Sequence, residues 1–190
     1  MAAPEPSTPR MSIIVKPVTW LPLGETTPPD LSPSIRSWLL TEESMTKHFE
    51  QHCSRVHVEL HQCGYITAAD LGDDDASLLP ACSRYWLREI TLFGDGTPWL
   101  FGRTLVPSSS PHVMDVVNLG TVPLGHYLFN GKHKLGRECV QIGLQGEDVY
   151  ARRSLLRVSG EPLLLTEVFQ PASPIYRGVA PKGQNGSSKQ

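Results

Sequence analysis

The chain has 190 residues, of which 39% are hydrophobic and 19% are charged, so we expect one domain with a substantial apolar core. Its formal net charge of −2 provides no basic field that would attract nucleic acid. No stretch approaches the roughly 20 apolar residues that cross a bilayer, so neither nucleic-acid partners nor membrane insertion is expected.

The two ends of the sequence differ from its middle. Residues 1–33 hold eight of the 17 prolines, which predicts an irregular or extended arm because proline fixes φ and removes a donor. Residues 177–190 are polar and glycine-rich, as is typical of a disordered tail. The folded domain is therefore expected at 34–176. The start, MAAPEPSTPR, has no apolar run behind a basic region, so we expect a cytoplasmic protein without a secretory signal.

The central part predicts an α+β fold with an antiparallel sheet. Helical patterns cover 35–40, 111–130 and 45–53, the last with Ser44 as its cap. Strand patterns cover 56–66, 84–93, 99–106, 138–144, 153–158 and 163–169. Asp95-Gly96 and the four residues 159–162 should turn two hairpins. Sequential hairpins make a sheet antiparallel, and the helices are expected to cover one of its faces.

Charged residues interrupt two mostly apolar strand faces. Because side chains alternate between the faces of a strand, Arg88 lies among apolar residues of 84–92 and Glu167 among those of 163–169. A buried charge is costly unless it is paired. One interpretation is that the faces are partly solvated, or that Arg88 and Glu167 pair with each other. The other is a closed ligand pocket, in which the arginine grips a carboxylate and the glutamate holds a hydroxyl or acts as a base.

The histidines give a weaker signal for a metal site. His48 and His52 are four residues apart, as are His57 and His61, and helical histidines at this spacing can share a metal. However, the H-E-x-x-H pattern is absent, no third ligand is evident, and the second pair falls in a predicted strand. We interpret all four as scattered surface histidines.

Other polar motifs point to ordinary surface structure. The sequence has no G-x-G-x-x-G, P-loop or G-x-S-x-G motif. The acidic run 73–75 is expected in a solvated loop, and Arg152-Arg153 at a solvated strand end. The four cysteines contain no C-x-x-C pair and are expected to be reduced thiols.

Four long blocks of the sequence resemble the chorismate lyase family. They are SWLLTEESMTKHFEQ (37–51), SRYWLREITLFGDGTPWLFGRTLVP (83–107), TVPLGHYLF (121–129) and RRSLLRVSGEPLLLTEVFQPASPIY (152–176). Ordered blocks of this length are far more specific than a short motif. The resemblance covers about 34–176 and leaves out the proline-rich arm and the polar tail.

The resemblance implies a fold and an activity. The fold is one domain with a six-stranded antiparallel sheet, helices packed on it, and a ligand pocket enclosed between the sheet and helical flaps. The activity is elimination of pyruvate from chorismate to give 4-hydroxybenzoate for ubiquinone biosynthesis. It implies a carbon–oxygen lyase that uses no metal and no organic cofactor. Chorismate and 4-hydroxybenzoate are the expected partners, and we expect a monomer.

The family's binding residues carry over one by one. Met45, in SMTK, matches the methionine that meets the substrate at the start of a helix, and Leu124, in PLG, matches a leucine that contacts the ligand through its backbone. Core packing is the alternative for both. Arg88, in WLRE, matches the arginine that pairs with the ring carboxylate. Glu167, in LLLTE, matches the glutamate near the ring hydroxyl, and whether it takes a proton or only orients the substrate stays open.

The match to the family is weaker at Val122, His126 and 135–139. None of the four matched binding residues lies at these positions.

The main alternative is a non-catalytic sensor domain of the same fold that binds a small aromatic acid, as in the effector-binding domains of some bacterial transcription regulators. Against it, the proline-rich arm before residue 34 is too short for a winged helix. A metal hydrolase built on the histidines is a more distant alternative.

Overall fold

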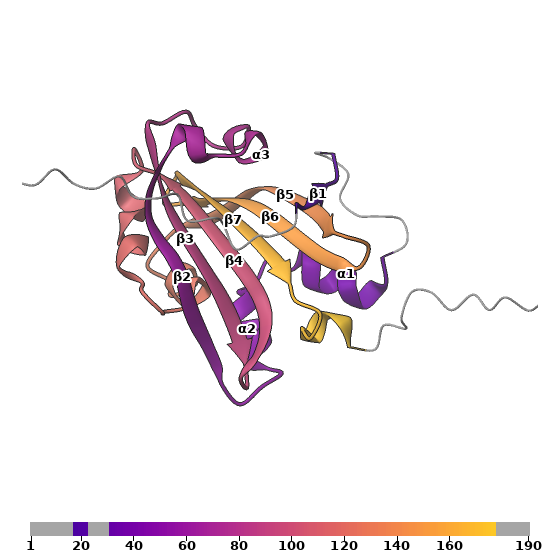
Figure 1. The fold of residues 1–190 in the computed structure, drawn as a ribbon. Coiled ribbons are helices and arrows are strands. Elements are labelled where there is room, and N and C mark those ends of the chain that lie inside the picture. Colours follow the sequence, from indigo (N-terminus) through magenta and orange to yellow (C-terminus); the bar gives the residue numbers. More distant parts are fainter. Residues whose placement is uncertain (1–16, 23–30, 178–190) are drawn as a thin grey trace, which may run out of the picture.

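One antiparallel sheet organises the molecule (Figure 1). The computed structural model describes residues 17–22 and 31–177, so most of the expected arm and tail lies outside the described residues. The strand order is β1-β5-β6-β7-β4-β3-β2. The strands are β1 (Thr19–Trp20), β2 (Val56–Thr67), β3 (Arg84–Gly94), β4 (Thr97–Pro107), β5 (Leu135–Gln145), β6 (Val149–Val158) and β7 (Glu161–Phe169). The predicted α+β class and antiparallel sheet are confirmed.

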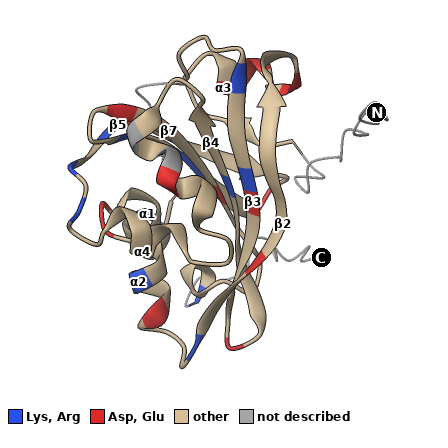
Figure 2. Ribbon diagram, turned by 90° about the vertical axis from the view of Figure 1, so that its left-hand side faces the viewer, with Lys and Arg blue, Asp and Glu red and all other residues tan. Residues whose placement is uncertain are grey.

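Short helices connect and cover the strands. They are α1 (Pro33–Leu40), α2 (Met45–Glu50), α3 (Asp73–Ala76) and α4 (Leu124–Leu128), with 3₁₀ turns η1 (Ala68–Asp70), η2 (Pro111–Asn118) and η3 (Pro174–Tyr176). Figure 2 shows α1, α2 and α4 gathered on one face of the sheet. Ser44 caps α2 as predicted, because its hydroxyl accepts a hydrogen bond from the backbone N–H of Lys47. None of the described helices is long and apolar enough to cross a membrane.

The expected number of strands is wrong by one. Six long strands are present, and the seventh is the two-residue β1, which pairs with β5 through Thr19↔Leu144 and Trp20↔Gly143. Part of the proline-rich arm therefore belongs to the sheet. Gly143 permits this pairing, since a Cβ there would lie 2.7 Å from the Trp20 ring. A strand of two residues flanked by prolines is too short to produce an alternation in the sequence.

The two predicted hairpins have the turn chemistry that their residues favour. Asp95 and Gly96 both have positive φ, 48° and 79°, as a tight turn between twisted antiparallel strands requires. The Asp95 carboxylate also accepts hydrogen bonds from the N–H groups of Ser54 and Arg55. The second turn is tighter than predicted. Only Ser159 and Gly160 form it, and β7 begins at residue 161.

The predicted helix over 111–130 is two separate pieces. The first is the 3₁₀ turn η2 and the second is α4, which begins at Leu124. Between them Gly120 has a φ of 52°, outside the helical region. Pro123 then fixes the entry to α4 and lacks the N–H that a continuous helix needs.

Two apolar clusters lie on the helix-covered face of the sheet. The first packs Trp38 of α1 and Phe49 of α2 against Leu92 of β3. The second packs η2 and α4 against the opposite end of the strands, for example Val116 against Val106. Their burial is the main favourable term that holds the helices on the sheet. The space between the clusters is where the candidate site lies.

Candidate functional site

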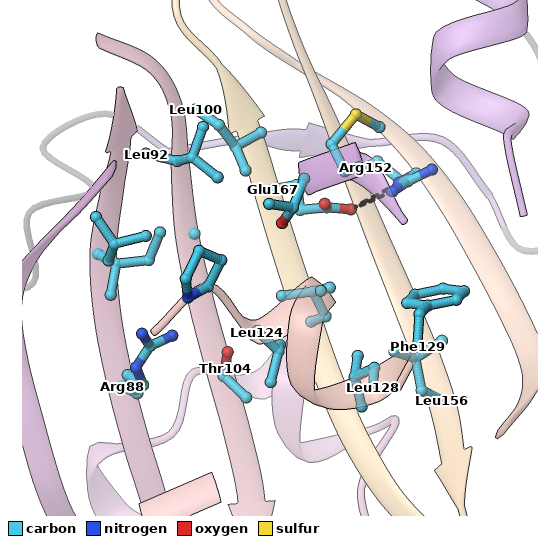
Figure 3. A pocket seen from close by; sticks show the side chains of 18 of the residues that line it. Arg88, Leu92, Leu100, Thr104, Leu124, Leu128, Phe129, Arg152, Leu156 and Glu167 are labelled. Carbon is cyan, nitrogen blue, oxygen red and sulfur yellow. Dashed lines mark hydrogen bonds and ion pairs between the residues drawn. The ribbon is translucent and has the colours of Figure 1, made fainter. Parts of the chain in front are cut away.

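A cavity lies between the sheet and the helices α2 and α4, where the two apolar clusters meet (Figure 3). Its volume is about 60 Å³. Apolar lining residues come from both clusters: Val58, Ile90, Leu92, Leu100, Leu128 and Leu156. Three arginines and one buried glutamate add charge: Arg88, Arg137, Arg152 and Glu167. An apolar pocket with a few placed charges suits a small organic anion.

All four residues carried over from the family blocks line this cavity. Arg88 projects from β3 and Glu167 from β7, while Met45 and Leu124 are the first residues of α2 and α4. The four side chains are buried. Met45 and Leu124 also belong to the two apolar clusters, so they pack in the core and line the cavity at the same time.

Arg88 is held by backbone oxygens and not by a carboxylate. Its Nη2 donates to the carbonyls of Gly120 and Val122 at 3.0 and 2.9 Å, and its Nε donates to Gly120 at 3.3 Å. The side chain is 2% exposed, and this burial lowers the pKa of the Arg88 guanidinium from its usual value. Among the described residues, its hydrogen bonds all start at Nε and Nη2. Nη1 is thus the nitrogen left for an anionic ligand.

Glu167 pairs with Arg152, not with Arg88. Nε and Nη2 of Arg152 lie 2.7 and 2.6 Å from Oε2 of Glu167, and the two residues are partners in the β6–β7 register. Nη1 of Arg152 donates to the carbonyls of Leu39 and Thr41. The expectation of a solvated strand end at Arg152 is wrong, because this residue is 1% exposed. Figure 3 shows the pair across the cavity from Arg88.

Two short helices close the cavity and contact each other closely. A Cβ on Gly125 would lie 2.6 Å from Oγ1 of Thr46, and closer still to Oγ of Ser44. Only glycine permits this approach of α4 to the start of α2. On the outer side, Nε2 of His126 lies 2.8 Å from Oε1 of Glu50, and this solvent-exposed hydrogen bond links the same two helices.

Arg137 is a further cavity residue that the sequence patterns did not indicate. It projects from β5, where a bulge separates it from Cys139, and its Nη1 lies 3.3 Å from Oγ of Ser154. Arg137 lines both the enclosed cavity and an adjoining outer cleft of about 410 Å³. Burial and the nearby positive charge of Arg152 lower the pKa of its guanidinium.

The opposite face of the sheet carries a second group of buried charges. Asp75 pairs with Arg103 at 2.7 Å and with Arg153 at 3.1 Å, and Arg153 also donates to Gln141. The Arg153 guanidinium stacks over the Trp20 ring. The expectations of a solvated loop at Asp75 and of a solvated Arg153 are therefore wrong. These ion pairs hold the segment around α3 against the sheet.

The histidines do not assemble a metal site in the described part of the chain. His48 stacks on Trp38 with ring centroids 3.9 Å apart, and His57 stacks on Phe93. His57 lies in β2, as the sequence predicted. Among the described residues, no group of three or more His, Cys, Asp or Glu side chains could hold an ion.

Comparison with known proteins identifies close relatives. The family model described as chorismate lyase matches residues 14–180. The chorismate pyruvate-lyase of Yersinia enterocolitica serotype O:8 is 51% identical over 165 residues, which is 86% of this chain and 95% of that protein. The chorismate pyruvate-lyase of Photorhabdus laumondii is 48% identical over 163 residues, 85% of this chain and 94% of that protein.

More distant similarity appears among solved structures. PhnF from Mycobacterium smegmatis superposes with a TM-score of 0.50 at 12% identity, covering 70% of this chain and 65% of that chain. The separate effector domain of PhnF gives a TM-score of 0.49, also at 12% identity, and covers 91% of that chain. At this identity the likeness to PhnF shows a shared fold alone.

Proposed function

Because the chain belongs to the chorismate lyase family, we propose that the enclosed cavity is the site at which it eliminates pyruvate from chorismate. The observation that carries the proposal is the gathering of Arg88, Glu167, Met45 and Leu124 around one apolar cavity. The activity is that of a carbon–oxygen lyase. The likeness to PhnF at 12% identity does not support a non-catalytic sensor, because it shows the fold alone.

The positions of Arg88 and Glu167 favour one orientation of chorismate in the cavity. Its ring carboxylate and ring hydroxyl lie at opposite ends of a six-membered ring, and Arg88 and Glu167 lie on opposite sides of the cavity. We assign Nη1 of Arg88 to the ring carboxylate, because a guanidinium binds a carboxylate through charge-assisted hydrogen bonds. Backbone N–H groups at the starts of α2 and α4, near Met45 and Leu124, add donors on that side.

The reaction needs little chemistry from the protein, since its driving force is in the substrate. The ether bond between the ring and the enolpyruvyl group breaks, and its electron pair leaves with the oxygen. The hydrogen on the hydroxyl-bearing carbon leaves as a proton, and that C–H electron pair becomes a ring π bond. The ring is then 4-hydroxybenzoate, and enolpyruvate takes up a proton at its methylene carbon to become pyruvate. Positioning and charge complementarity are the protein's contributions.

Glu167 orients the ring hydroxyl in this proposal. Both short contacts from Arg152 end on Oε2, so Oε1 is the oxygen that can accept the hydroxyl hydrogen. The proton then passes directly from the ring carbon to the enolpyruvyl methylene. A protein base is not required by this route.

Release of the aromatic product requires movement of the covering helices. The cavity is narrow and closed by α2 and α4, so we expect slow product release with opening of 45–53 and 111–130. A monomer that works in the cytoplasm and supplies 4-hydroxybenzoate to ubiquinone synthesis completes the proposal.

The first test is incubation of purified, chelator-treated protein with chorismate, with both products followed together. We expect 4-hydroxybenzoate and pyruvate in a one-to-one ratio. The Arg88→Met variant is the matched control, and it should form both products far more slowly because it lacks one anchor. If 4-hydroxybenzoate binds but neither product forms, the domain is a sensor and the proposed activity is wrong.

A further inference from the structure

Chorismate carries a second carboxylate, on the enolpyruvyl group, which Arg88 does not reach when it holds the ring carboxylate. We propose that Arg137 binds this second carboxylate and thereby distinguishes the substrate from the product. The inference rests on the proposed function and adds a residue to the same site.

The position of the ring hydroxyl determines where the second carboxylate lies. The enolpyruvyl ether is attached to the ring carbon next to the one that carries the hydroxyl. With the hydroxyl at Glu167, the enolpyruvyl group therefore starts close to Glu167. Of the two sides of the ring, we place it on the side of Arg152 and Arg137, where cavity donors remain for a carboxylate. Arg137 reaches this region, because its Nη1 contacts Ser154, two residues from Arg152 on the same face of β6. Two residues of a strand span about 7 Å.

The three cavity arginines differ in how fully they are engaged. Arg152 directs Nε and Nη2 to Glu167 and Nη1 to two carbonyls, so its donors are occupied inside the protein. Arg88 is assigned to the ring carboxylate. Among the described residues, the hydroxyl of Ser154 is the one group that accepts a hydrogen bond from Arg137. Arg137 is therefore the cavity cation with most donors left for a ligand.

The charge balance of the cavity also favours an anion at Arg137. The pair Arg152–Glu167 is neutral, which leaves Arg88 and Arg137 as two cations facing a substrate with two carboxylates. Two further carboxylates are exposed to solvent: Glu43 lines the cavity, and Glu42 lines the outer cleft. Burial and, after it, repulsion by Arg152 lower the pKa of Arg137, and a carboxylate bound at Arg137 would offset that repulsion.

The location of Arg137 suits a group that leaves first. It lines both the enclosed cavity and the outer cleft, whereas Arg88 lines the enclosed cavity alone. Pyruvate released at Arg137 therefore adjoins the cleft, while 4-hydroxybenzoate stays under α2 and α4. The order of release follows from the placement of the two arginines.

The test compares the dicarboxylate substrate with the monocarboxylate product in the Arg137→Met variant. We expect kcat/KM for chorismate to fall about 10- to 100-fold, the value of a charge-assisted hydrogen bond. The Kd of 4-hydroxybenzoate, measured by calorimetry, should stay within about twofold, because the product lacks the second carboxylate. Arg137→Lys keeps the positive charge and should recover part of the loss.

Two controls separate this role from others. Arg157→Met removes an arginine of the same hairpin that pairs with Glu138 outside the cavity, and it should change neither quantity. Arg88→Met should lower kcat/KM and product affinity together. Equal losses of both quantities in Arg137→Met, or no change in either, would overturn the assignment. If Arg137→Met does not fold, the same comparison is made with Arg137→Lys. Failure of the wild-type protein to turn over chorismate would instead refute the proposed function.

Discussion

Glu167 presents a single carboxylate oxygen to the cavity, because Arg152 occupies the other one at 2.6–2.7 Å. At the residue scale, this ion pair determines what the glutamate can do. Removal of the Glu167 carboxylate leaves the charge of Arg152 buried without a partner, which strongly destabilises the fold. A substitution at Glu167 therefore has to separate loss of chemistry from loss of structure.

Two substitutions at Glu167 distinguish an orienting role from a base. Glu167→Gln keeps the size of the side chain and one oxygen, for which Arg152 and the ring hydroxyl compete, so we expect a drop in turnover of about tenfold, against more than 100-fold for Glu167→Ala. A general base would be lost equally in both variants. The measurement is kcat at saturating chorismate. Thermal unfolding of each variant checks that the domain stays folded when Arg152 has lost its carboxylate partner. Near-normal turnover in Glu167→Ala would remove the residue from the mechanism.

Alternation along two strands was sufficient to predict that Arg88 and Glu167 interrupt apolar faces. The partner of Glu167 depended on one further detail, the length of the turn between β6 and β7. A two-residue turn at Ser159-Gly160 pairs Glu167 with Arg152, whereas the predicted four-residue loop would pair it with Ser154. A slip of two residues keeps the face and changes the neighbour, and this is why Arg152 was missed.

At the element scale, α2 and α4 behave as one cover over the cavity. Each is too short to be stable alone, with six and five residues, so tertiary packing holds both. The contact of Gly125 with Ser44 and Thr46 sets the distance between them. The sequence indicated the Ser44 cap of α2, but it predicted η2 and α4 as one helix. The contact between α2 and α4 is long-range and has no local pattern in the sequence.

We predict that Gly125→Ala forces the two helices apart. The added methyl group would overlap Thr46 and Ser44, at a cost of about 1–3 kcal/mol. We expect faster dissociation of 4-hydroxybenzoate in stopped-flow experiments, together with a lower Tm. Gly72→Ala is the matched control, because a Cβ there meets nothing within 4 Å. An unchanged dissociation rate in Gly125→Ala would show that these helices do not limit release.

At the scale of the whole molecule, the sheet buries charges on both faces, and the cavity lies on the face that the helices cover. The group around Asp75 joins the segment between β2 and β3 to β4 and β6. The acidic run 73–75 suggested a solvated loop because nothing local marks its third residue. Burial of Asp75 depends on Arg103 and Arg153, which are 28 and 78 residues away.

We predict that Asp75→Ala destabilises the whole domain. Without this carboxylate, Arg103 and Arg153 lose their shared partner, and breaking a buried ion pair costs about 3–5 kcal/mol. Urea denaturation should show a lower midpoint with little change in slope. Asp74→Ala, which changes an exposed neighbour in the same helix, should unfold close to the wild-type midpoint. Equal midpoints for the two variants would contradict a stabilising role for the buried group.

The place of β7 between β4 and β6 has a consequence for how the protein is made. The last strand of the described residues joins the β2–β3–β4 meander to the β5–β6 hairpin, and it carries Glu167. While the ribosome has not yet released residues 161–169, β4 and β6 each have an unpaired edge, which is a known route to aggregation. Pairing of β7 with both neighbours thus completes the continuous sheet and the cavity in the same step of folding.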